Sequence, residues 1–265
     1  MVDISHKPST QITFEHPAGD EQVRLYLRLE YLYTELKKHM KEESVSHSKN
    51  AMTALLKILN VIDRPDLKSK LVQTLTSHAT NLSQLIEAPN VNKVVLEDIL
   101  QRLYQHIHYL HNYQGKIGES LRKNEFLTQI RLHLNNPAGA NEYTLPTYHL
   151  WLSKPGYDRI QDLQLWSHPL LDLGSIIEQL LNLMRKSTEG KKVVAKNGFY
   201  QQDQDIALPC KLLRVSLPAH LGMFPQVSAN KHSIHIILME PDFYHGNKPT
   251  QVKNDIEFEL TCCRL

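Results

Sequence analysis

Apolar residues recur every three or four positions over most of the first 187 residues, which is the spacing of one face of an α-helix. The pattern predicts helices over residues 20–40, 44–61, 65–86, 91–117 and 121–134, then two short ones between Thr147 and Trp166, and a last one from Pro169 to about 187. In the first helix a leucine stripe is widened by Val23, Leu27 and Tyr31, so we expect that helix to be largely enclosed. Long helices joined by short turns indicate an antiparallel helical bundle.

The period changes to two after about residue 188. Apolar and polar residues alternate around residues 213–217, 234–238 and 256–260, which predicts a small antiparallel sheet with one solvated face. A short alternating segment, Ile12 to Glu15, has no partner nearby, and we expect it to join the C-terminal sheet. The predicted fold class is therefore α+β. Its two domains are residues 1–187, with the N-terminal strand and the helices, and residues 188–265, with the strands.

Composition places the chain among ordinary globular proteins. It has 265 residues, 41% hydrophobic and 22% charged, and 30 basic residues against 28 acidic ones give a net charge of +2. Any electrostatic function must therefore be local. We expect no membrane span, because no segment is apolar for 18 residues, and we expect a cytoplasmic protein, because cysteines are few and the start is polar.

Candidate catalytic and metal-binding patterns are not supported by their spacing. His106 and His108 are two residues apart on a predicted helix and point about 200° away from each other. Cys262 and Cys263 are adjacent in a predicted strand and face opposite sides, so we expect neither a shared metal nor a disulfide between them. The sequence predicts no enzyme, no cofactor and no metal site. A hydrolase with partners remote in the sequence stays an alternative.

The positive chemical signal is cationic. Arg24 and Arg28 are four residues apart and share a face of the first long helix, bordered by apolar residues. Spacing alone leaves open whether Arg24 simply pairs with Asp20 or Glu21. Further basic residues gather in later segments: Arg122, Lys123, Arg131, His149, and Arg185 to Lys196. Basic clusters on a nearly neutral chain imply acidic faces elsewhere, and such polarised surfaces suit a protein partner better than a nucleic-acid duplex, although a nucleic-acid-binding helical protein is the alternative.

Six segments carry a resemblance to a known family. They are Phe14-Glu15-His16-Pro17, Arg24 to Glu30, Leu145 to Leu152, Asn197-Gly198-Phe199-Tyr200-Gln201, Pro225-Gln226-Val227-Ser228 and Phe258 to Cys263. In this order they resemble the ZapD family, the Z-ring-associated cell division proteins of Gammaproteobacteria and their relatives. One such segment is weak, but six in register over nearly the whole chain are specific.

The resemblance implies a non-catalytic, cytoplasmic homodimer at the midcell division ring. Its partner would be FtsZ, the tubulin-like GTPase of that ring, bound through its short C-terminal tail, and the dimer would cross-link and bundle FtsZ filaments. The binding residues that the resemblance implies are Arg24, Arg28, Arg122, His149 and Lys231. The sequence departs from the family pattern at Glu125 and Ser233, where basic residues are expected.

Overall fold

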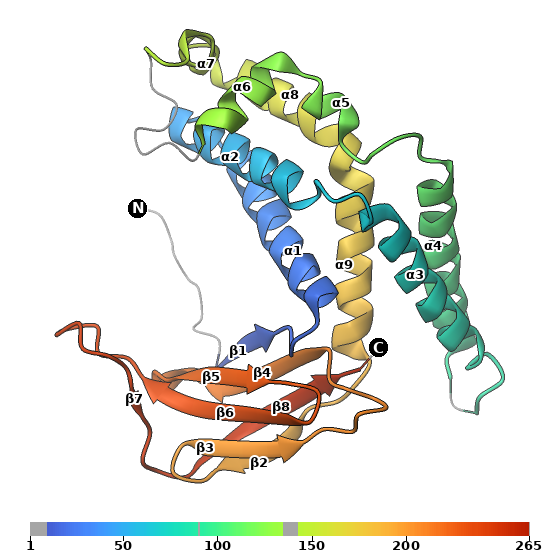
Figure 1. Cartoon of the computed structure of the whole chain (residues 1–265), viewed down its shortest axis with the longest axis vertical. Helices are drawn as coiled ribbons and strands as arrows, with labels where there is room; N and C mark the ends of the chain where they lie inside the picture. Colours follow the sequence, from blue (N-terminus) through green and yellow to red (C-terminus); the bar gives the residue numbers. More distant parts are fainter. Residues whose placement is uncertain (1–9, 90, 135–142, 265) are drawn as a thin grey trace. The chain divides into compact units, whose positions relative to one another are not determined.

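The computed structural model describes residues 10–89, 91–134 and 143–264, and it confirms the α+β class (Figure 1). Helices occupy the chain between residues 21 and 186, and antiparallel strands follow, joined by the N-terminal strand β1. The chain forms two compact units, described here one at a time. The first unit comprises residues 1–27 and 181–265, and the second comprises residues 28–180. The division at residue 187 stays a prediction.

Side-chain caps begin several of the helices. Asp20 Oδ1 accepts the N–H groups of Gln22 and Val23, while Ser44 and Asn92 cap the second and fourth helices. The helices are α1 (Glu21–His39), α2 (Val45–Val61), α3 (Leu67–Ser83), α4 (Lys93–Asn112), α5 (Glu119–Arg122), α6 (Glu125–His133), α7 (Pro146–Leu152), α8 (Gly156–Ser167), the 3₁₀ turn η1 (His168–Leu170) and α9 (Leu171–Lys186).

The predicted helix over residues 121–134 is interrupted. Asn124 has extended backbone dihedrals, and its Oδ1 accepts the Leu127 N–H at 3.1 Å, so a new helix, α6, begins where the prediction continued one. The helix predicted to reach residue 117 ends at Asn112. Pro169, predicted in the first turn of the last helix, lies in η1 just before it. Each difference falls at a helix end, where local capping competes with periodicity.

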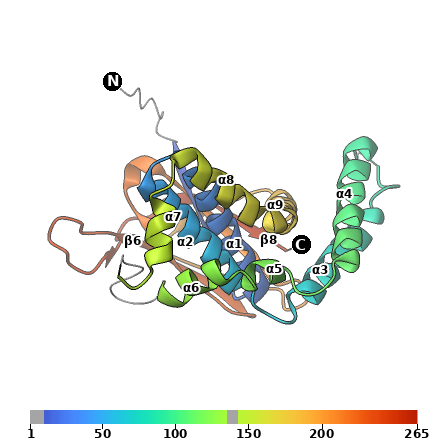
Figure 2. The ribbon, with the colours of Figure 1, turned by 90° about the horizontal axis from the view of Figure 1, so that it is seen from above.

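Leucines from several helices make the core of the second unit. Leu55, Leu59, Leu71 and Leu103 are completely or almost completely buried. The pair α3 and α4 lies side by side in both views (Figures 1 and 2). The leucines whose spacing predicted these helices therefore face inward.

The described strands form two antiparallel sheets, so the prediction of a single sheet was wrong. The strands are β1 (Gln11–His16), β2 (Lys191–Ala195), β3 (Phe199–Asp203), β4 (Leu212–Pro218), β5 (Phe224–Ala229), β6 (Ser233–Glu240), β7 (Thr250–Gln251) and β8 (Ile256–Cys263), with a 3₁₀ turn η2 (Ala219–Leu221). The first sheet has the order β1-β4-β8-β2, and in the second β3-β6-β5 is extended by β7 beside β6. Strand β3 carries Gln201, Gln202 and Asp203, so its alternation was too polar to detect.

One apolar core joins the two sheets. It contains Val215 and Leu260 from the first sheet and Ile234 and Ile236 from the second. On the opposite face of the first sheet, Leu212 and Cys263 pack with Val23 and Met184 from the ends of α1 and α9 that belong to this unit. One end of that opposite face is therefore covered, while Lys192, Val194 and Glu257 on the same face stay exposed, so the predicted solvated face is confirmed there.

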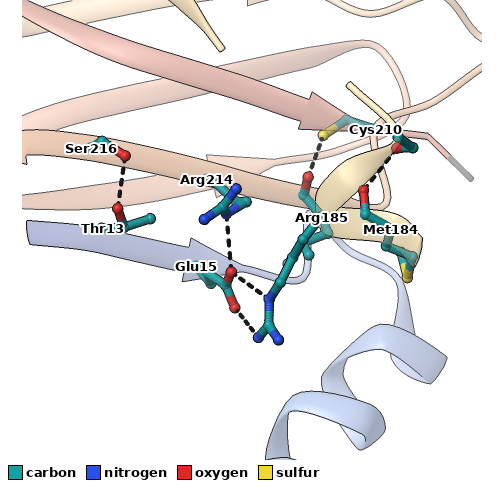
Figure 3. Close-up of polar contacts among 9 residues, drawn as sticks. Thr13, Glu15, Met184, Arg185, Cys210, Arg214 and Ser216 are labelled. Atoms are coloured by element: carbon teal, nitrogen blue, oxygen red, sulfur yellow. Dashed lines mark hydrogen bonds and ion pairs between the residues drawn. The ribbon is translucent and has the colours of Figure 1, made fainter. Parts of the chain in front are cut away.

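Strand β1 joins the sheet as predicted. It pairs antiparallel with β4 from Gln11 opposite Pro218 to His16 opposite Leu213, and Thr13 and Ser216 share a hydroxyl hydrogen bond of 2.8 Å (Figure 3). The first unit is thus built from both ends of the chain.

Candidate protein-docking surface

Two of the predicted binding arginines lie on the outward side of α1. Arg24 and Arg28 are one helical turn apart and both are exposed. Tyr31, three residues further on, is 64% exposed on the same side, where the sequence predicted it to be enclosed. An aromatic ring therefore extends this cationic face, and the α1 face is the name used below for Arg24, Arg28 and Tyr31.

The two guanidinium groups differ in their partners. Arg24 Nε lies 3.6 Å from Glu21 Oε1, and both side chains are about half exposed or more, so this contact is weak. Asp20, the other acid considered for Arg24, instead caps the helix. The Arg28 side chain makes no ion pair or hydrogen bond with any residue that the structure describes. Its charge is fully available to an external ligand.

The turn between β5 and β6 brings Lys231 to the first unit's surface. Asn230 Oδ1 accepts the N–H groups of His232 and Ser233 at 2.8 and 3.0 Å, which shapes a tight turn with Lys231 exposed at its tip. The turn lies close to the start of α1, because a Cβ placed on Gly19 would sit 3.6 Å from the Ala229 carbonyl oxygen. Lys231 and Arg24 thus belong to neighbouring segments.

His16 lies in the same neighbourhood. Its Nδ1 accepts the Ala18 N–H at 3.1 Å. Burial, and next the positive charge of Arg24, lower the pKa of His16 from its ordinary value of 6.5. The positive charge of Arg24 therefore acts on the His16 imidazole, which lies just before the start of α1.

Arg122, in the second unit, is mostly committed to internal contacts. Its Nη1 donates to the Ile117 carbonyl at 2.7 Å, its Nε lies 3.5 Å from Asp63 Oδ1, and the side chain is only 15% exposed. These contacts hold the segment that leads into α5. Glu125, which departs from the family pattern, begins α6 and accepts a hydrogen bond from Gln129.

His149 lies on α7 above an aromatic cluster. Tyr148 and Trp151 are buried and stacked at 5.8 Å between ring centroids, with Phe126 and Trp166 beside them. Trp151 Nε1 donates to Asp162 Oδ2 at 2.8 Å, which anchors α7 on α8. His149 itself is exposed, next to Leu150, which is 71% exposed.

Other cationic residues that the sequence singled out are neutralised inside the first unit. Glu15 accepts from Arg185 at 2.8 Å through Nε and at 2.6 Å through Nη2, and from Arg214 Nε at 3.1 Å (Figure 3). Lys192 pairs with Glu257 at 3.4 Å. The basic run from Arg185 to Lys196 therefore presents less unpaired positive charge than its sequence alone indicates.

Metal binding and membrane insertion are two other functions that the side chains could serve. In the described ranges, no group of three or more His, Cys, Asp or Glu side chains is arranged to hold a metal ion. Among the helices of those same ranges, none has the length and apolar character needed to cross a membrane.

Tyr31 is the surface residue that sequence reasoning missed. Its spacing from the leucine stripe suggested burial, yet it follows Arg24 and Arg28 on the same face of the helix. Its position three residues after Arg28 was the available signal, because residues at that spacing share a helix face.

Comparison with known proteins identifies relatives along nearly the whole chain. A family model described as ZapD, cell division protein, matches residues 27–237. The Cell division protein ZapD of Coxiella burnetii strain RSA 493 is 43% identical over 257 residues, which cover 97% of this chain and 99% of that protein. The proteins of the same name from Bordetella petrii and Chromobacterium violaceum are 36% and 33% identical, over 95% and 96% of this chain and 99% and 100% of their own lengths.

Proposed function

This chain belongs to the ZapD family of cell division proteins, and on that premise we propose that it is a non-catalytic homodimer that binds the C-terminal tail of FtsZ. In this proposal the dimer cross-links and bundles FtsZ filaments in the cytoplasmic division ring at midcell. The observation that carries the proposal is the α1 face, where Arg28 is exposed without an internal partner among the described residues and Arg24 is held only by a weak surface contact.

The chemistry of the α1 face suits a short peptide with acidic and apolar residues. Guanidinium groups recognise carboxylates with directed hydrogen bonds, and Arg28 would form them without first breaking an internal pair. The exposed Tyr31 ring offers apolar contact beside the charges. Charge then sets the rate of encounter and the ring prolongs the bound state.

The other four binding residues contribute unequally in this proposal. Arg24, His149 and Lys231 are exposed, so each can meet a ligand directly. Arg122 is mostly buried and bonded to Ile117 and Asp63, so we assign it to holding the α5 segment in place as well as to binding.

Bundling follows from symmetry and repetition. A two-fold dimer carries each docking surface twice, and a filament presents its tail on every subunit. Many weak contacts along two filaments then add to strong cross-linking.

Charge reversal on α1 tests the proposal. We expect Arg28→Glu to abolish co-sedimentation with polymerised FtsZ, and Arg24→Glu to weaken it, because each places a repulsive carboxylate against an acidic tail. The matched control is Arg102→Glu. Arg102 is also an exposed helical arginine and holds an ion pair at i,i+4 with Asp98, but it lies on α4. That control should still bundle FtsZ.

Salt, tail deletion and solution mass test the electrostatic and dimeric parts of the proposal. Bundling should weaken as salt rises, because exposed charge pairs are screened beyond about 8–10 Å at physiological ionic strength. FtsZ lacking its C-terminal tail should not be bundled. Circular dichroism should show each variant folded, and retained bundling by folded Arg28→Glu would contradict the proposal.

The mass in solution, measured by light scattering, should be that of two chains, and a monomer would remove the cross-linking mechanism.

The nucleic-acid alternative is weaker than the sequence suggested. Arg185 is paired with Glu15, and Lys192 lies beside Glu257, so the basic run presents fewer free charges than its composition. A gel shift with duplex DNA and single-stranded RNA near physiological salt tests it.

A further inference from the structure

Two cysteines far apart in the sequence meet at one end of the β core. Cys210 precedes β4 and Cys262 is the penultimate residue of β8. In the β4–β8 ladder Leu213 lies opposite Cys262, and the Lys211 N–H donates to the Cys263 carbonyl at 2.9 Å. The Cys210 and Cys262 thiols lie close enough for each to shift the pKa of the other. Cys210 belongs to the core between the two sheets, and Cys262 is partly buried and packs against that core.

The position of Cys210 is well defined. Its thiol lies 3.5 Å from the Leu212 carbonyl oxygen, and its N–H donates to Gln204 Oε1 at 2.7 Å (Figure 3 shows the thiol contact). Gln204 is held in turn by the carbonyl oxygens of Asn230 and His232. Cys210 is buried, so it meets Cys262 and not solvent.

Cys262 is the accessible member of the pair and lies in a cationic environment. It is half-buried, and the charges of Arg264 and of Lys191, on the neighbouring strand β2, act on it. The interaction with the Cys210 thiol is the main cause that lowers the pKa of Cys262, and these two charges lower it further against the opposing effect of burial, while the pKa of Cys210 is raised. The thiolate, which is the nucleophilic form, is therefore favoured at the half-buried Cys262 sulfur.

We propose that Cys262 is a site of oxidative modification, with Cys210 as the resolving thiol that closes a reversible disulfide with it. The oxidant is a hydroperoxide. The Cys262 thiolate attacks the peroxide, the O–O bond breaks, and Cys262 becomes a sulfenic acid while hydroxide leaves. The Cys210 sulfur then attacks the Cys262 sulfur, an S–S bond forms, and water leaves with the Cys210 proton. The two thiols lose two electrons, and hydrogen peroxide becomes two waters. This inference does not depend on the proposed function.

Cys263 is an internal control supplied by the chain. It is adjacent to Cys262 but faces the other side of the first sheet, fully buried among Leu212, Val23 and Met184. Burial is the main influence on Cys263 and raises its pKa, so it should stay reduced.

The test uses the full chain treated with hydrogen peroxide, alkylated and digested with trypsin. Cleavage after Lys196 and Lys211 releases Cys210 in the peptide 197–211. Cleavage after Lys253 and Arg264 releases Cys262 and Cys263 together in the peptide 254–264. We expect a disulfide-linked pair of these peptides, lost on adding dithiothreitol. Cys263→Ala should keep the linked pair, and Cys262→Ser should lose it completely.

A third variant separates the two chemical steps. In Cys210→Ser the sulfenic acid of Cys262 has no resolving thiol, so dimedone should label it, whereas dimedone should label little of the wild-type chain. A link that survives in Cys262→Ser, or that disappears in folded Cys263→Ala, would overturn the proposal. So would wild-type Cys262 that stays reduced at peroxide concentrations that oxidise glutathione.

Discussion

The two units accommodate a guanidinium group in opposite ways. In the first unit, Glu15 is a carboxylate shared by Arg185 and Arg214, and all three side chains keep 20 to 31% of their surface in solvent. In the second unit, Arg159 is 4% exposed, and the structure gives it only neutral oxygen acceptors among the residues it describes. The acceptors are Ser48 Oγ at 2.9 Å, the Leu152 carbonyl at 3.1 Å and the carbonyls of Lys154 and Glu43.

The difference shows what each arginine contributes. Arg159 joins the segment before α2 to the segment before α8 through directed hydrogen bonds. Its contribution to stability therefore comes from satisfying backbone carbonyl oxygens. The Glu15 group joins β1, β4 and the end of α9 through charge, and it is partly screened by water. Arg28 of the α1 face has neither kind of partner in the described part of the chain, which leaves it available for a ligand.

Among the substitutions that test this difference, Arg159→Met should have the largest effect on stability. The change keeps an unbranched apolar stem but leaves the hydroxyl and carbonyl oxygens around it without a donor, and each buried unsatisfied group costs about 1–3 kcal/mol. We expect the free energy of unfolding, from urea denaturation, to fall by about 3 kcal/mol or more. Arg102→Met, at an exposed ion pair, is the control and should change it by less than about 1 kcal/mol. Equal effects would show that Arg159 has no special structural role.

A smaller effect is expected from Glu15→Gln. The neutral amide removes the negative charge that two guanidinium groups share, while it keeps the shape of the side chain. Because these groups are partly solvated, we expect a loss of about 1–2 kcal/mol in the free energy of unfolding. The matched control in the same sheet is Glu257→Gln, whose partner Lys192 is largely exposed, and it should be nearly neutral. A larger loss from Glu257→Gln would contradict this ranking.

The smallest effect concerns pH and His16. Its pKa in the folded protein lies below 6.5, so the unfolded chain binds a proton more readily. The stabilisation is present above pH 6.5 and is lost as the pH falls from there through the lowered pKa. We expect His16→Gln to flatten this part of the unfolding free energy against pH, and Arg24→Gln to flatten it less, since burial is the larger cause. An unchanged profile in His16→Gln would disprove this origin.

Local pattern accounts for the parts of the fold that the sequence predicted. The leucine spacing indicated the long helices, the alternation in β6 and β8 indicated antiparallel strands, and the unpartnered segment at Ile12 indicated a strand of the C-terminal sheet. The exposure of Arg24 and Arg28 also agrees with their expected place on one helix face. All of these follow from periodicity within a few turns or residues.

Only tertiary structure decided which charges and thiols are free. Glu15 meets Arg185 and Arg214 across 170 and 199 residues, Arg122 turns inward to Ile117, and Cys210 meets Cys262. The second sheet likewise depended on partners for strands too polar to detect alone. Periodicity reports the environment of a residue along its own helix or strand, whereas pairing depends on which distant segments the folded chain brings within about 3–4 Å.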